Sequence, residues 1–131
     1  MISVDTSVLV RYLVGSPPDQ AARTTRLLDE SERLGVSLLA LVESAHVLRT
    51  QYGVNRTEVV NALIGLVRRQ NVEILGMDTD DATDALLRAR AIVSCPIPDA
   101  LIAVQARATR ALPLFTFDRG LSRIGVPVAE P

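Results

Sequence analysis

The sequence predicts an α/β fold, specifically a three-layer α/β/α domain with a mostly parallel central sheet of four to five strands. Short apolar segments alternate along the chain with longer segments whose apolar residues recur at helical spacing. Strands that alternate with helices usually form a parallel sheet that is covered by helices on both faces. With 131 residues, of which 48% are hydrophobic, the chain is expected to form a single domain over residues 1–131 with a core of its own.

The predicted strands are short apolar runs bounded by polar residues or by turn signals. The first run leads directly into Asp5, and the fourth, Leu-Phe-Thr-Phe, leads directly into Asp118. The carboxyl ends of parallel strands meet at one edge of a sheet, where ligands gather, so we expect a shared site there. The predicted strands cover residues 1–4, 36–39, 72–75, 114–117 and 126–129.

The predicted helices combine an apolar stripe with start and stop signals. Gly15 ends the first helix, and Gly35 and Gly53 are expected to end the second and third. Asn55 and Glu58 resemble a capping box, in which an N-cap side chain is followed three residues later by Glu. The predicted helices cover residues 6–14, 19–34, 40–52, 55–70, 78–93 and 99–109, with one helical turn at 120–124.

The composition excludes several classes of function. All 14 basic residues are Arg and none is Lys, which excludes a Walker-type phosphate lysine, a Schiff base and lysine-assisted phosphotransfer to an aspartate. Aromatic residues make up 3% of the chain and Trp is absent, which argues against a stacking platform for single strands. The net charge of −1 gives no global sign of nucleic-acid binding, although Arg suits bidentate phosphate contacts.

The cysteine content and the lack of long apolar runs indicate where in the cell the protein is expected to be. Cys95 is the only cysteine, so an internal disulfide is impossible and a reducing compartment is expected. No apolar run is long enough to span a membrane, and the first residues lack the charged and apolar regions of a signal peptide. We therefore expect a soluble, cytoplasmic protein that does not act at a membrane.

Four acidic residues stand in otherwise apolar segments: Asp5, Glu43, Asp99 and Asp118. A buried carboxylate costs several kcal/mol unless it is paired or bound to a metal. Of the four, only Asp118 has a basic residue directly beside it. If the fold brings them together, they repel one another and favour a divalent cation, which is the usual machinery for cutting phosphodiesters.

These segments resemble the PIN-domain family, and most closely the VapC-type toxins of bacterial toxin–antitoxin pairs. The resemblance rests on four stretches that occur in order and span almost the whole chain. They read Val-Asp-Thr-Ser-Val-Leu-Val-Arg-Tyr-Leu from residue 4, Leu-Val-Glu-Ser-Ala-His-Val-Leu from 41, Pro-Asp-Ala-Leu-Ile-Ala from 98 and Phe-Thr-Phe-Asp-Arg from 115.

The resemblance implies an endoribonuclease that depends on Mg²⁺ or Mn²⁺, is usually a homodimer and is inhibited by a VapB-like antitoxin. By position, Asp5 and Asp99 match the principal metal ligands of the family. Glu43 and Asp118 match its other acidic site residues and are further candidate ligands. The metal would lower the pKa of a bound water, and Glu43 or Asp118 would orient or deprotonate that water.

Five further side chains near these acids have two interpretations each. Thr6, Ser7 and Thr116 have hydroxyls that can bond metal-bound water or a substrate phosphate, but the same hydroxyls can cap helices. Arg11 and Arg119 can bind RNA phosphates, but they can also be ordinary solvated residues. We treat the three hydroxyls as supporting residues and the two arginines as substrate-binding candidates.

An alternative from another class is a non-catalytic RNA- or protein-binding module on the same fold. The family often carries a further acidic residue in the loop before Asp99, whereas this chain has Cys95-Pro-Ile-Pro. Asp5 and Asp99 can also serve only as helix caps, and Asp118 can serve only as a turn residue. The choice of RNA, and of one metal ion or two, remains open at this level.

Overall fold

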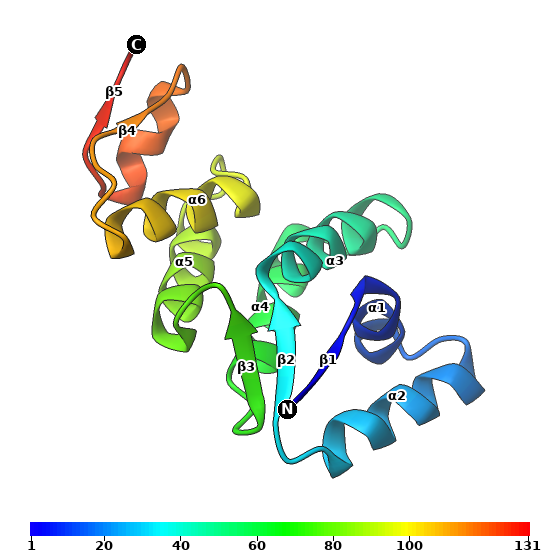
Figure 1. The fold of residues 1–131 in the computed structure, drawn as a ribbon. Helices are drawn as coiled ribbons and strands as arrows, with labels where there is room; N and C mark the ends of the chain where they lie inside the picture. The colour runs from blue at the N-terminus through cyan, green and yellow to red at the C-terminus, as the bar shows by residue number, and fades with distance from the viewer.

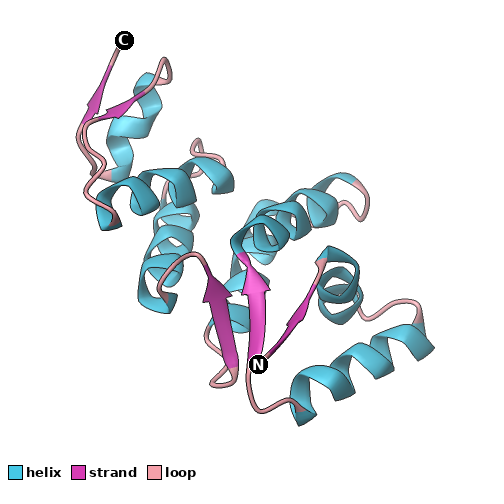
Figure 2. Cartoon of the chain, in the orientation of Figure 1, coloured by secondary structure: helices cyan, strands magenta, loops and turns pink.

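The computed structural model describes all 131 residues. Its helices and strands alternate for most of the chain, as Figures 1 and 2 show. The strands are β1 (Ile2–Val4), β2 (Leu34–Ser37), β3 (Val72–Leu75), β4 (Leu114–Phe115) and β5 (Val128–Ala129). The helices are α1 (Thr6–Val14), α2 (Pro18–Glu30), α3 (Leu38–Thr50), α4 (Arg56–Val67), α5 (Thr79–Ala91) and α6 (Ile97–Ala108), followed by the 3₁₀ helix η1 (Arg119–Ile124).

The main sheet contains β1, β2 and β3 in that order, and both pairs are parallel. In register, Val4, Val36 and Ile74 stand side by side, and all three are buried. The next row, Ser3, Gly35 and Glu73, lies on the opposite face, because side chains alternate along a strand. The core of the domain therefore lies against one face of this sheet.

The other two strands form a separate parallel sheet, in which Leu114 pairs with Val128 and Phe115 with Ala129. All five expected strands are thus present, but they are divided three and two rather than joined in one sheet of four to five. The reason lies in the preceding helices. α5 packs on α4, α6 packs on α5 and η1 packs on α6, so the chain reaches β4 on the β3 side of the main sheet, away from β1 (Figure 1).

The helices share one apolar core with the main sheet. α3 contacts β2, α4 contacts β3, and α1 contacts α3. The largest side chains that are fully buried include Leu9, Leu41, Leu63, Leu86 and Ile124, which come from five different elements. No helix is long and apolar enough to cross a membrane.

Side-chain caps begin four of the helices, at Asp5, Ser37, Asn55 and Asp78. The predicted start at Asn55 is confirmed, because its Oδ1 accepts a hydrogen bond from the backbone N–H of Glu58 at 2.9 Å. The first helix also ends as expected. Gly15 adopts a left-handed conformation with φ of 75°, which glycine tolerates best.

The second predicted helix was too long, since it extended to residue 34 whereas α2 ends at Glu30. The Asn71 side chain binds the end of α2: its Nδ2 donates to the carbonyl oxygens of Leu28 at 2.7 Å and Ser31 at 2.8 Å. Leu34 then begins β2, and its backbone N–H donates to the Asn71 carbonyl at 2.7 Å. These bonds between distant segments replace the helical ones, and no local pattern signals them.

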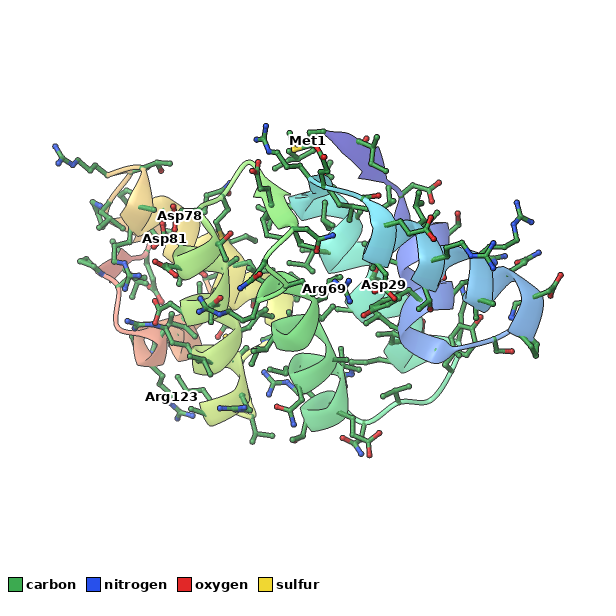
Figure 3. All side chains as sticks on the ribbon, turned by 90° about the horizontal axis from the view of Figure 1, so that it is seen from below. Met1, Asp29, Arg69, Asp78, Asp81 and Arg123 are labelled. Atoms are coloured by element: carbon green, nitrogen blue, oxygen red, sulfur yellow. The ribbon has the colours of Figure 1, made fainter.

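Arg69 reinforces the same junction. Its guanidinium forms an ion pair with Asp29 of α2 at 2.7 Å and donates to the Tyr12 hydroxyl at 3.0 Å. Figure 3 shows the side chains of Arg69 and Asp29 next to each other. The pair is partly exposed, so we assign it a role in orienting α2 more than in stabilising the fold.

Gly35 was expected to end a helix, but it lies inside β2. A Cβ atom at this position would lie 3.1 Å from both δ carbons of Leu75, whose side chain covers the glycine. The absence of a side chain at residue 35 therefore lets β2 and β3 pair with Leu75 folded over them.

We expect Gly35→Val to lower the free energy of unfolding by about 1–3 kcal/mol, because the added methyls displace Leu75. Gly65 in α4 is the matched control, because no atom lies within 4 Å of a Cβ there. Gly65→Ala should raise stability by roughly 0.5–1 kcal/mol, since Ala restricts the unfolded chain. Urea unfolding followed by circular dichroism measures both changes. An unchanged midpoint for Gly35→Val would contradict the packing, and Leu75→Ala should reduce its cost.

Candidate active site

Two of the four acidic residues line one surface hollow of about 390 Å³. Asp5 comes from the junction of β1 and α1, and Glu43 comes from the second turn of α3. They meet because α1 packs against α3. Arg11 lies in the same wall. The remaining lining residues are Thr6, Ser7, Val10, Val47, Gln51 and Tyr52.

Asp5 caps α1 and keeps one oxygen free. Its Oδ1 accepts both the Ser7 hydroxyl, at 2.6 Å, and the backbone N–H of Val8, at 3.2 Å. These donors, with the Ser7 hydroxyl first, hold the pKa of the Asp5 carboxyl below its usual range. The N-cap interpretation of Asp5 is therefore confirmed, but capping uses only Oδ1. Oδ2 remains an ionised oxygen that can bind a ligand.

Glu43 is exposed and forms no hydrogen bond or ion pair within the chain. Val47 and Gln51 follow it at intervals of four residues, so all three lie along one stripe of α3 and line the same hollow. Gln51 and Tyr52 also line this hollow and were not among the site residues predicted from the sequence. The i, i+4, i+8 spacing from Glu43 was the available signal for Gln51.

Arg11 is held in the hollow by groups of its own region. Its Nη1 donates to the Ser7 carbonyl at 3.0 Å, and its Nε donates to the side-chain carbonyl of Gln20 in α2. The guanidinium is thereby oriented near Asp5 without forming an ion pair with it. A hollow that combines two carboxylates with an oriented guanidinium offers both acidic ligands and a phosphate-binding group.

The other two acidic residues line a second hollow of about 400 Å³. Asp99 lies in the first turn of α6, and Asp118 follows β4. Asp118 caps η1, because its Oδ1 accepts the backbone N–H of Gly120 at 2.8 Å. The rest of the wall is mainly apolar and consists of Ile102, Leu114, Phe115, Thr116, Phe117 and Leu121.

The electrostatics of this second pair are unfavourable. Burial, and then the negative charge of Asp118, raise the pKa of Asp99 above its usual range. Burial also raises the pKa of the Cys95 thiol, and the charge of Asp99 adds to that effect. The loop between α5 and α6 contains Cys95. Arg56 of α4 holds this loop, because its guanidinium donates to the Cys95 carbonyl. No donor satisfies the Asp99 carboxylate in this arrangement.

The structure thus brings the four acidic residues together in two pairs, Asp5 with Glu43 and Asp99 with Asp118. It does not bring the pairs together, because β1 and β4 are not neighbours. No group of three or more His, Cys, Asp or Glu side chains is arranged to hold a metal ion. The oxygen donors are of the kind that Mg²⁺ and Mn²⁺ prefer, but the single cluster expected at one sheet edge is not formed within the chain.

With this geometry in place, the chain can be compared with known proteins. The PIN domain matches it over residues 2–127. The chain belongs to the PIN domain family. This match confirms the predicted PIN-like α/β class, with the division of its strands described above. No curated protein sequence matches the chain.

The PIN domain is a nuclease fold whose members are generally metal-dependent nucleases acting on RNA or DNA. The remaining predicted residues of this PIN domain have different surroundings. Thr6 and Ser7 lie in the first hollow, where Ser7 acts through Asp5. The Thr116 hydroxyl accepts the backbone N–H of Asp118 at 2.9 Å, which orders that turn. Arg119 pairs with Glu130 at 3.3 Å and its side chain is 89% exposed, as the solvated interpretation expects.

We expect Asp99→Asn to raise the melting temperature of the metal-free chain at pH 7. The pKa of Asp99 is raised in the folded state, so its stabilising contribution is present at low pH and is lost as the pH rises through that pKa. The amide removes the desolvated charge. The advantage of the variant should therefore vanish below the ordinary carboxyl pKa of about 4. Thermal unfolding in EDTA between pH 3 and 7 measures it.

Asp19→Asn is the matched control, because Asp19 is an exposed carboxylate in the first turn of α2. It should retain the pH dependence of the unaltered chain. An equal or lower melting temperature for Asp99→Asn at pH 7 would contradict the strained environment assigned to Asp99.

Proposed function

We propose that this chain is an endoribonuclease that depends on Mg²⁺ or Mn²⁺ and acts as the toxin of a type II toxin–antitoxin pair. The observation that carries the proposal is the first hollow. There an ionised Asp5 with a free oxygen and an unpaired Glu43 lie beside the oriented guanidinium of Arg11. These groups lie in a PIN domain, so phosphodiester hydrolysis is the chemistry that best explains them.

The acidic residues have assigned roles in this proposal. Asp5 and Asp99 are the principal metal ligands, and Glu43 and Asp118 complete the acidic site. A desolvated carboxylate costs stability, and such groups concentrate at functional sites. The pKa of Asp99 is raised by burial and by Asp118, which supports a role in function over a role in folding. Glu43 is exposed and forms no bond within the chain, so its carboxylate is free to bind a ligand.

RNA as substrate and an antitoxin partner are proposed on the resemblance of the four acidic segments to VapC-type toxins. A cytoplasmic location is proposed on the single cysteine and the absence of signal-peptide features. The proposed partner is a VapB-like antitoxin, an arm of which would cover the acidic residues of the site. An Arg of that arm would satisfy the carboxylates, as a guanidinium does for paired carboxylate oxygens.

A second candidate is a non-catalytic RNA- or protein-binding module. The specific observation in its favour is that no three acidic side chains cluster within one chain. The Cys95-Pro-Ile-Pro loop, which lacks an acidic residue, points the same way.

The purified chain is expected to cut RNA in the presence of Mg²⁺ or Mn²⁺ and to stop in EDTA. Asp5→Asn should lower the rate by about 100-fold or more without unfolding the chain, because Asn can still accept the Val8 N–H as an N-cap. Asp19→Asn, at an exposed position outside both hollows, serves as the control and should cut normally. Gel analysis of a total RNA pool measures all three. Equal cleavage by Asp5→Asn would remove this residue from the site.

Expression of the chain alone should arrest the growth of a bacterial host if it is a toxin. Asp99→Asn should relieve the arrest, because it removes a proposed metal ligand, whereas Asp19→Asn should not. Growth curves after induction, with the protein level checked by blotting, measure this. Unimpaired growth with the active chain present at a high level would leave a nuclease without a toxin role.

A further inference from the structure

A groove lies between α1 and α2, next to the first hollow. Its volume of about 380 Å³ falls within the roughly 300–1,000 Å³ of pockets that hold small ligands. α1 packs against α2 (Figure 1), and each helix contributes side chains at intervals of three or four residues, which lie along one stripe. The residues that line this α1–α2 groove are Val8, Arg11, Gln20, Arg23, Thr24 and Leu27.

The groove carries positive charge and contains no acidic side chain. Arg11 and Arg23 are its only ionised residues. Arg23 is exposed and forms no hydrogen bond or ion pair within the chain, so its N–H groups are free to bind a phosphate bidentately. The charge of the groove therefore favours an anionic ligand.

Arg11 connects the groove to the first hollow, because this residue lines both. Its Nη1 donates to the Ser7 carbonyl in the first hollow at 3.0 Å, and its Nε donates to the Gln20 side chain in the groove. A phosphate bound at Arg11 is thus next to both spaces. A chain molecule with a phosphate on every unit can occupy the two together.

Two polar side chains of the groove have hydrogen-bonding directions that the fold fixes. Arg11 can only donate, so the Gln20 oxygen faces it and the Gln20 Nε2 remains a free donor. The Thr24 hydroxyl donates to the Ala21 carbonyl at 2.9 Å, so only its lone pairs remain as acceptors. The groove therefore offers a donor and an acceptor beside aliphatic side chains. The exposed edges of an unpaired nucleobase carry the complementary groups.

We propose that the α1–α2 groove holds one unpaired nucleotide of a single-stranded RNA that also occupies the first hollow. Arg11 and Arg23 bind its phosphates, and Gln20 and Thr24 read its base. The base packs on aliphatic side chains and on a guanidinium plane, in place of the aromatic platform that the composition excludes. This inference deepens the proposed function and rests on it, since RNA is the proposed substrate.

RNA binding in EDTA tests the groove without cleavage. Fluorescence anisotropy of a labelled single strand of about 12 nucleotides measures the affinity at several salt concentrations. Arg23→Gln should bind every sequence roughly 5–10-fold more weakly, and its salt slope should fall by about 0.7, as expected for one lost phosphate contact. Arg90→Gln, at an exposed position of α5 outside the groove, is the control with the same net charge and should bind normally. Equal affinities in the two variants would overturn the proposal.

Base reading has a separate test. Thr24→Val removes the acceptor but keeps the shape of the side chain, and the exposed neighbouring position provides Thr25→Val as the control. The affinities for A, C and U homopolymers of equal length are compared. Thr24→Val should reduce the ratio of the strongest to the weakest affinity by about 5-fold or more, whereas Arg23→Gln should lower all three alike. An unchanged ratio in Thr24→Val would overturn the proposal.

Cleavage kinetics distinguish a binding role for Arg23 from a structural one. In the proposal Arg23 holds the substrate equally in the ground state and in the transition state. Arg23→Gln should therefore raise KM by roughly 5–10-fold and leave kcat unchanged. A fall in kcat with an unchanged KM would contradict the role assigned to this residue.

Two competitors decide which kind of molecule fits the groove. Duplex RNA of the same sequence should displace the labelled single strand at least about 10-fold less effectively, because a paired base cannot enter, although its charge density is higher. Polyglutamate of equal charge should also compete poorly. Competition by the duplex as strong as that by the single strand would indicate a purely electrostatic surface, and equally strong competition by polyglutamate would indicate a site for an acidic peptide. Either result would overturn the proposal.

The outcomes separate this inference from the proposed function. Base-selective binding that depends on Arg23 and Thr24, in a chain that cuts no RNA, would retain the groove and reject the nuclease. Cleavage with the same KM and base preference in Arg23→Gln and Thr24→Val would retain the nuclease and reject the groove.

Discussion

The packing of α1 against α3 is the contact on which the first hollow of this chain depends. A parallel strand delivers the residue that follows it to the carboxyl edge of its sheet, so the neighbour of β1 decides which side chains meet Asp5. Within one chain β2 is the only neighbour, and α3 contributes Glu43 through its packing on α1. The α5–α6 pair carries the remaining acidic residues to the other end of the molecule (Figure 1).

The two acidic pairs differ in their electrostatic balance. Asp5 is supported by the Ser7 hydroxyl and by the start of α1, which lower its pKa. Asp99 has no such donors, and burial with the charge of Asp118 raises its pKa. The folded chain therefore stabilises the ionised form of Asp5. It destabilises the ionised form of Asp99, whose charge no cation or donor within the chain offsets. The two acidic pairs therefore differ in how well the folded chain stabilises their charges.

The local elements were largely predictable because their signals are local. α1 and β3 match the predicted residues 6–14 and 72–75, because an apolar run or stripe and its flanking residues define each of them. The Asn55 cap is of the same kind. The end of α2 was not predictable, since Asn71 binds its last carbonyl groups from 40 or more residues away. Gly35 was also misassigned, because the Leu75 side chain that covers it is equally distant in sequence.

By itself, the sequence determined the α/β class, the parallel direction of the strands, the PIN-type order of its acidic segments and the position of Asp5, Asp99 and Asp118 beside element termini. These properties depend on composition, periodicity and capping over a few residues. Only the tertiary structure decided which acids share a hollow and which strand edges stay open. Those outcomes depend on how α4, α5 and α6 pack against one another, and helix packing is set by contacts between segments far apart in the chain, which no local pattern encodes.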